Sequence, residues 1–216
     1  MTSARNTGDL HKVLNNASPV KLRSLIITVK YIILTLAALL IFSVSVFALY
    51  KPVRILLPEI FGISCESNVC VDDSSQRGYA LSLLDAAKQR LEAQHDLSIG
   101  GPKIIFCSAA KCQDTFGLGK KAGFTLGAHG IVIAPRGWKE YYVAHELIHY
   151  WQAENFGSLV LLTGEPWLIE GMAYALSNDP RTELHEPFES YRNRFNRWRR
   201  LNAGIPFKKS IEQALK

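Results

Sequence analysis

The pattern of apolar and polar positions divides the chain at one uninterrupted apolar run. No charged residue lies between Tyr31 and Tyr50, and the segment just before it, from Leu25 to Val29, is apolar as well. At about 1.5 Å per residue, a helix of roughly 20 residues spans about 30 Å, the thickness of the hydrocarbon core of a bilayer. The pattern therefore predicts a transmembrane helix over residues 25–50.

The charges that flank this run predict its orientation. Five cations lie before it or at its start: Arg5, Lys12, Lys21, Arg23 and Lys30. Fewer follow closely, namely Lys51 and Arg54, and this asymmetry keeps residues 1–24 in the cytoplasm and places the rest on the exported side. A cleaved signal peptide would use the small residue Ala48, and a buried core helix would show a polar stripe. Because the run is longer than a usual signal-peptide core, we expect an uncleaved signal anchor.

The rest of the chain alternates between short apolar stretches and helical periodicity. Residues 51–75 predict an irregular lead-in, and residues 76–216 predict one folded domain. Helical spacing predicts helices over 78–94, 138–155, about 166–177 and 188–201, with a short helix that Ser108 caps and Gly117 ends. Strands are predicted at 103–107, 123–126 and 130–134. A small sheet followed by helices belongs to the α+β class.

Composition and charge narrow the function classes. With 48% hydrophobic residues the chain can bury a core, which excludes wholesale disorder. Part of the net charge of +6 comes from a cluster of arginines between Arg192 and Arg200. No base-stacking or groove-reading motif accompanies this cluster, so no nucleic-acid partner is expected. A solvated helix face is the simpler interpretation, and a lipid- or envelope-binding anchor protein is a rival one.

Four cysteines lie after the apolar run and none before it. An even number confined to the exported part indicates disulfides formed in an oxidising compartment. Of the three connectivities, the two C-x4-C spacings favour the local pairs Cys65–Cys70 and Cys107–Cys112. A zinc site made of all four thiolates is an alternative, although its spacing is wider than the usual C-x2-C. If the predicted membrane orientation is wrong, we expect the four cysteines to be free thiols.

The stretch from Tyr141 to Gln152, YYVAHELIHYWQ, carries the candidate chemistry. His145 and His149 lie four apart, so one helix face can present both imidazoles to one metal ion. Glu146 is offset from that face and stays close to a bound water. Zinc lowers the pKa of such a water, and a neighbouring carboxylate takes its proton during attack on a carbonyl.

A catalytic zinc site needs a third protein ligand, and Glu170 is the candidate. It lies in EPWLIEGMAYA, on the next predicted helix, 21 positions after His149. The turn between the two helices allows the chain to reverse and to bring a carboxylate back to the metal. Without a third ligand, the histidines would be ordinary polar residues of a helix surface.

HELIH followed by WLIEGMA resembles the gluzincin branch of the zincin metallopeptidases, and most of all its aminopeptidase-type members. The resemblance covers residues 124–177 and implies that His145, His149 and Glu170 bind one zinc ion per chain, with Glu146 as general base. It also implies a minimal zincin-like domain, in which an edge strand near 130–134 holds the substrate backbone by strand addition.

The match departs from the family in two respects. One gluzincin subgroup has an Asp one turn after the third ligand, which supports a zinc-bound histidine, and here that position is Tyr174. The electrophile that stabilises the tetrahedral oxyanion is not marked by a motif. We place Tyr191 and His185 first among the candidates, ahead of Arg192 and His129.

These features together predict a membrane-anchored zinc metallopeptidase whose domain acts on a peptide or protein substrate on the exported side. The alternative is a zincin-fold domain that binds zinc but acts as a non-catalytic binding or structural module, because a small domain leaves little room for a deep specificity pocket. No acidic anchor for a free amino terminus precedes HELIH, which favours an endopeptidase or a selective processing enzyme.

Overall fold

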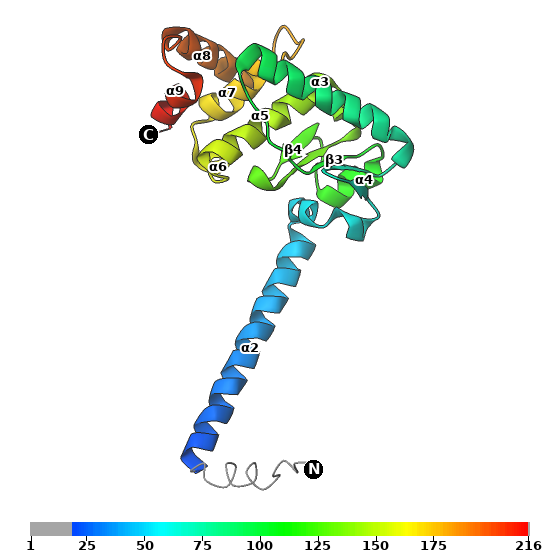
Figure 1. Cartoon of the computed structure of the whole chain (residues 1–216), viewed down its shortest axis with the longest axis vertical. Helices are drawn as coiled ribbons and strands as arrows, with labels where there is room; N and C mark the ends of the chain where they lie inside the picture. Colours follow the sequence, from blue (N-terminus) through cyan, green and yellow to red (C-terminus); the bar gives the residue numbers. More distant parts are fainter. Residues whose placement is uncertain (1–18, 216) are drawn as a thin grey trace, which may run out of the picture. The chain divides into compact units, whose positions relative to one another are not determined.

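The computed structural model describes residues 19–215, which divide into two compact units between Leu49 and Tyr50. The first unit is described from residue 19 onward and consists of one long helix, α2 (Pro19–Leu49) (Figure 1). Most of the segment predicted to lie in the cytoplasm, residues 1–18 of 1–24, is outside the described residues.

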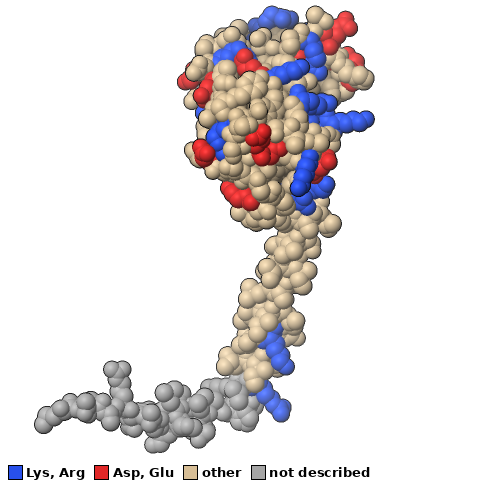
Figure 2. Space-filling model, turned by 90° about the vertical axis from the view of Figure 1, so that its right-hand side faces the viewer, with Lys and Arg blue, Asp and Glu red and all other residues tan. Residues whose placement is uncertain are grey.

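Helix α2 is long and apolar enough to cross a membrane over Arg23–Leu49. On the face drawn in Figure 2, blue Lys and Arg side chains lie on the part of this helix nearer Pro19, and the rest of the helix is tan. Three hydroxyls within its apolar run are satisfied internally, because Thr35, Ser43 and Ser45 each donate to the carbonyl four residues earlier at 2.8 Å. A helix that satisfies its own hydroxyls needs no water, which suits a hydrocarbon environment.

The second unit contains a five-stranded sheet in the order β1-β2-β3-β5-β4. The strands are β1 (Ser64–Glu66), β2 (Val69–Val71), β3 (Ile104–Phe106), β4 (Gly123–Thr125) and β5 (Ile131–Ile133). β2, β3 and β5 run parallel, whereas β1 pairs antiparallel with β2 and β4 pairs antiparallel with β5. The domain is therefore α+β with a small mixed sheet, as the order of elements predicts.

Both faces of the central strands are buried, because side chains alternate across a pleated strand. Ile104 and Phe106 belong to the larger core, which they share with α3 (Arg77–His95) and α5 (Glu140–Phe156). Ile105 and Cys107 belong to a second core, which includes Phe116 of α4 (Ala110–Phe116) and residues of η1 (Lys51–Leu56). In Figure 1, α3 and α5 lie together on the side of the sheet away from α4.

Four helices complete the larger core or lie next to it. They are α6 (Val160–Thr163), α7 (Pro166–Leu176), α8 (Phe188–Leu201) and α9 (Phe207–Ala214). Helix α7 packs against both α5 and α8. The sequence pattern predicts α3, α5, α7 and α8 to within about two residues at each end, but it does not predict α9.

The segment predicted as an irregular lead-in, residues 51–75, contributes to the sheet. It contains η1, η2 (Pro58–Phe61) and the β1–β2 hairpin. Cys65 and Cys70 are paired residues of this hairpin and form a disulfide, and a second disulfide joins Cys107 to Cys112 of α4. Both predicted cysteine pairs are confirmed.

Two local expectations are wrong. Ser108 does not cap α4; instead the carboxylate of Asp72, which follows β2, accepts hydrogen bonds from the backbone N–H groups of Ser108 and Ala109 at 2.7 and 3.0 Å. The strand at 130–134 is not an edge, because β5 lies between β3 and β4. The edge on this side of the sheet is β4, which ends at Thr125.

Candidate metal centre

The two histidines of the motif lie on α5, the buried central helix of the domain. Helix α5 begins after Trp138, whose indole Nε1 donates to the carbonyl of Cys107 at 2.7 Å and so ties the start of the helix to the end of β3. No glycine or proline interrupts it before Gly157. Since positions four apart share a helix face, His145 and His149 project to the same side.

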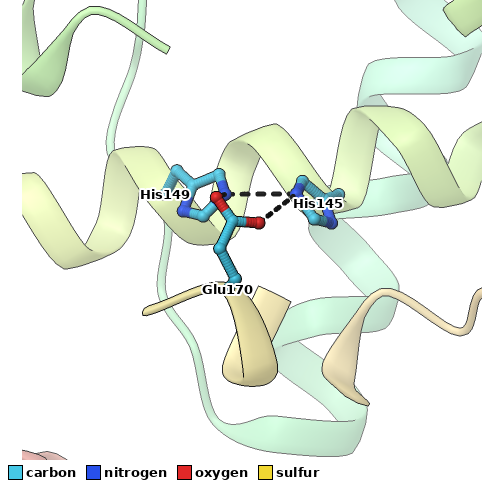
Figure 3. A group of neighbouring side chains, drawn as sticks. All are labelled: His145, His149 and Glu170. Atoms are coloured by element: carbon cyan, nitrogen blue, oxygen red, sulfur yellow. Dashed lines mark hydrogen bonds and ion pairs between the residues drawn. The ribbon is translucent and has the colours of Figure 1, made fainter. Parts of the chain in front are cut away.

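Glu170 comes from α7, which has a proline at its first turn, where the missing N–H costs nothing. In Figure 3 the imidazoles of His145 and His149 and the carboxylate of Glu170 face one another. The two Nε2 atoms are 3.1 Å apart, and each lies 3.6 Å from one carboxylate oxygen of Glu170. Packing of α7 on α5 thus brings together three residues that the sequence pattern selected.

These separations fit a single small metal ion. Two donors bonded at about 2.0–2.2 Å to one tetrahedral ion lie roughly 3.3–3.6 Å apart. Donor atoms of the three side chains all fall within 4.8 Å of one another. Two imidazoles and one carboxylate could therefore hold a metal ion without rearrangement of the backbone.

The charges of the cluster are strongly coupled. Burial lowers the pKa of His149, but the Glu170 carboxylate, with a smaller contribution from Glu146, outweighs burial and raises that pKa to about 9. Burial raises the pKa of Glu170, yet the charges and hydrogen bonds of His149 and His145 bring it far below its usual range. The cluster thus keeps Glu170 ionised and His149 protonated, so a metal ion that bound here would displace the proton of His149 and replace its charge beside Glu170.

Gln152 orients His149 and ties α5 to α7 next to Glu170. Its side-chain Oε1 lies 2.9 Å from Nδ1 of His149, and its Nε2 donates to the backbone carbonyl of Ile169 at 3.0 Å. If Nδ1 carries the proton, Nε2 of His149 keeps its lone pair for a metal. Because Ile169 precedes Glu170, the same amide links the two ligand helices. The sequence pattern did not select Gln152, although it lies one turn after His149 on the same helix.

Glu146 stands beside the cluster and not within it. It is 8% exposed, and the hydroxyl of Thr125 in β4 donates to its Oε2 at 2.7 Å. Gly123 leaves room for it, because a Cβ at that position would lie 2.6 Å from the Glu146 Cγ. The edge strand therefore holds Glu146 next to the ligands without adding it to them.

The cluster opens into a cavity of about 830 Å³. Its lining includes the whole of β4, His145, Glu146, His149 and Glu170, together with Tyr174 of α7. The ring of Tyr174 lies edge-on to that of His145, with centroids 4.5 Å apart. Burial, followed by the charge of Glu170, raises the pKa of Tyr174 to about 12. Its hydroxyl therefore stays protonated at neutral pH and is available as a hydrogen-bond donor.

Arg181 is a second polar side chain of the cavity that the sequence pattern missed. Its Nε donates to both carboxylate oxygens of Asp179, at 2.8 and 3.1 Å, and Asp179 itself is only 2% exposed at its side chain. The guanidinium also lies over the rings of Tyr142 and Tyr174. Arg181 is thus held in place while it remains 42% exposed to the cavity side of the molecule.

The electrophiles predicted from the sequence lie elsewhere. Tyr191 packs on α8 against Phe188 and the larger core, and the Nδ1 of exposed His185 is bonded to the carbonyl of Glu186. Neither residue lines the cavity. Arg192 donates to the carbonyl of Arg181 and also lies outside the lining, whereas His129 is part of it. The structure therefore brings together the ligand set and Glu146, but not Tyr191 or His185.

Comparisons with protein-family models, with curated proteins and with solved structures found no match to this chain. The geometry of the cluster and of its cavity is therefore what supports a function for this domain.

Proposed function

We propose that the protein is a membrane-anchored zinc metallopeptidase of the gluzincin kind. The observation that carries the proposal is the meeting of His145, His149 and Glu170 within one ion's reach. A carboxylate outside that set, Glu146, lies beside them in the same cavity. A site that only stored or sensed a metal would not need this fourth residue.

The donor set suits zinc. Two neutral imidazoles and one carboxylate are a ligand set of catalytic zinc sites, in which the fourth position is left to water or substrate. Bound zinc would lower the pKa of that water toward neutrality and polarise the carbonyl of the substrate. His145, His149 and Glu170 would hold the ion, and Gln152 would keep His149 in the required tautomer.

Glu146 is the general base and then the general acid in this proposal. The Thr125 hydroxyl engages one of its carboxylate oxygens, which leaves the other to take a proton from the attacking water. The same carboxylic acid then donates that proton to the nitrogen of the leaving amine. Strand β4 has an unpaired outer side that lines the cavity, so an extended substrate can bind along it by strand addition.

Tyr174 and Arg181 replace Tyr191 and His185 as the proposed stabilisers of the oxyanion. Both line the cavity and Tyr174 touches His145. A protonated phenol and a guanidinium fixed by a buried carboxylate are preorganised donors, which is what stabilisation of a developing negative charge requires.

The anchor in the membrane is α2, and the domain is proposed to lie on the exported side. Support comes from the excess of cations before the apolar run and from the two disulfides after it. The rival role for the arginine cluster has less support, because Arg194 lies over Trp167, Arg199 lies over Phe207 and Arg192 is bonded to Glu189.

The test combines metal analysis with a peptidase assay on the purified full chain in detergent. We expect about one zinc per chain, lost in Glu170→Ala, and kept in Glu146→Gln with a loss of about 10²–10⁴ in kcat. A Glu146→Gln variant as active as the wild type would contradict the proposed role of Glu146. A wild type that binds zinc but cleaves no peptide of a broad library would favour the non-catalytic alternative.

A further inference from the structure

The charges of the cavity lining are unevenly distributed. Its only acidic residues are Glu146 and Glu170, and both are engaged, with Thr125 and with the histidines. Among the described residues, Lys120, Lys121 and Arg136 also line it, and none of the three forms an ion pair. All three are exposed. Apart from Glu146 and Glu170, the charged residues among the described lining are therefore cationic.

These three cations gather at one end of β4. Lys120 and Lys121 directly precede the strand, and Arg136 follows β5 in η5 (Pro135–Gly137). The backbone joins the two places, because the N–H of Ala134 donates to the carbonyl of Ala122 at 2.8 Å. Lys121 also lies over the ring of Phe124 in β4, 5.0 Å from its centroid.

The other end of β4 is apolar. Leu126 follows the strand, and Leu159, Leu161 and Leu162 line the cavity from the α6 region. Leu159, just before α6, and Leu162 within it are 71% and 82% exposed, so together they present an exposed apolar patch beside the cavity. The N–H of Ala128 donates to the hydroxyl of Ser158, which brings α6 to this end of β4.

Glu146 lies between the two ends. Its side chain contacts Gly123 at the start of β4 and Thr125 at its end. A chain extended along β4 would therefore have its reacting bond in the middle, with cations beyond one side of that bond and leucines beyond the other. Since a strand advances about 3.3 Å per residue, each end is within a few substrate residues of the bond.

We propose that the substrate is an acidic polypeptide segment, with Asp or Glu side chains on one side of the cleaved bond and an apolar side chain on the other. This inference rests on the proposed function and names its substrate class. Charge complementarity carries it, because like charges placed against Lys120, Lys121 and Arg136 would be repelled and opposite charges attracted and steered into the cavity.

The test uses internally quenched peptides with one common core, in which Glu, Gln or Lys is placed on either side. For the wild-type full chain in neutral detergent, we expect kcat/KM to be at least about tenfold higher for Glu than for Lys on one side. High salt should reduce that ratio, because it screens exposed charges. Equal kcat/KM for Glu and Lys on both sides would overturn the proposal.

Charge-reversal variants test whether these cations cause the preference for Glu over Lys in the peptide. Lys120→Glu/Lys121→Glu should abolish or invert that preference. Arg136→Glu should weaken it and leave Lys121 in place over Phe124. The matched control is Lys208→Glu/Lys209→Glu, another adjacent exposed pair, which lies on α9 outside the cavity lining. A preference that survives both cavity variants would overturn the proposal, as would cavity variants that change only binding to anionic-lipid vesicles.

Binding to the inert Glu146→Gln variant separates the two proposals. Fluorescence anisotropy of the same peptides reports charge preference without any hydrolysis. If the acidic peptide binds more tightly but the wild type never cleaves it, the substrate class stands as a ligand class and the peptidase proposal fails. If the wild type cleaves all peptides alike and the variant binds them alike, the peptidase proposal stands and the acidic preference fails.

Discussion

We expect zinc binding at the proposed centre to depend on Gln152, which is not one of the proposed ligands. Its amide joins Nδ1 of His149 to the carbonyl of Ile169. We expect Gln152→Leu to weaken zinc affinity about 10–100-fold, because the tautomer of His149 and the position of α7 are then no longer fixed. Competition with a chelator measures the change.

Asn155→Ala is the control for this prediction, since Asn155 lies on the same helix and bonds only the carbonyl of Trp151 at 2.9 Å. Its zinc affinity should equal that of the wild type. An unchanged affinity in Gln152→Leu would show that packing alone orients His149.

Tyr174 and Tyr191 offer a direct comparison of two tyrosines. Tyr174→Phe should lower kcat about 10²-fold with little change in KM, because the lost hydroxyl stabilises charge only in the transition state. Tyr191→Phe should leave kcat unchanged, since its side chain is outside the cavity lining. Steady-state kinetics on one peptide measure kcat for both variants. If kcat fell in Tyr191→Phe and not in Tyr174→Phe, Tyr191 would again be the candidate electrophile.

The residues of the centre differ in how far the sequence could reveal them. His145, Glu146 and His149 are fixed by helix periodicity alone, and Glu170 by one reversal of the chain. Tyr174 follows Glu170 by four positions on α7, so helix periodicity places it on the same face, whereas the position of Arg181 depends on where residues 178–187 return to the cavity, which no local pattern encodes. Arg181 reaches the cavity through its bond to Asp179, and neither residue stands out in the sequence.

The packing of α7 on α8 depends on Gly171, the residue after Glu170. A Cβ at this position would lie 2.4 Å from the carbonyl oxygen of Tyr191. Gly171→Ala must therefore push the two helices apart, and we expect it to lower the free energy of unfolding by about 1–3 kcal/mol. Displacement of α7 should also weaken zinc binding through Glu170.

Gly78→Ala is the matched control at this scale. Gly78 lies on the exposed side of α3, and nothing would come within 4 Å of an added Cβ. Because alanine favours a helix over glycine, this change should raise the free energy of unfolding by about 0.5–1 kcal/mol. Thermal unfolding measures both variants, and a Gly171→Ala protein as stable as the wild type would show that α8 can move away at no cost.

A helix can be predicted from the sequence where its apolar period continues for several turns. The pairing of strands that are distant in the sequence cannot. Helices α5 and α7 follow from their own residues, with clear start and stop signals. Short apolar runs between turn residues predict β3, β4 and β5, whereas β1 and β2, with three residues each inside the segment 51–75, carry no such signal. Strand order depends on contacts between distant segments, which is why β4 and not β5 is the edge.

The described part of the chain combines a helix that has no buried side chain over residues 23–49 and a domain with two cores. α2 keeps its apolar residues exposed, as a membrane helix alone in water would, while the domain buries its own on both faces of the sheet. The domain contains two local disulfides, each across a short loop. By restricting the unfolded chain, each is expected to stabilise the fold by about 2 kcal/mol. The helix that could span a membrane and the cores that stabilise the domain are thus separate parts of the chain.

This separation leads to a prediction for the full chain. It should stay with the membrane fraction after alkaline carbonate extraction, whereas a chain that starts at Tyr50 should be soluble and keep about one zinc. Leu39→Arg/Leu40→Arg, in the middle of α2, should release the full chain, because each charge at the centre of a bilayer costs about 2.5–3.5 kcal/mol. The matched variant Leu159→Arg/Leu162→Arg, on the domain, should leave the full chain in the membrane fraction. If carbonate released the wild type as well, α2 would be a peripheral or cleaved segment, and the zinc content of the released chain would then show whether the domain functions without an anchor.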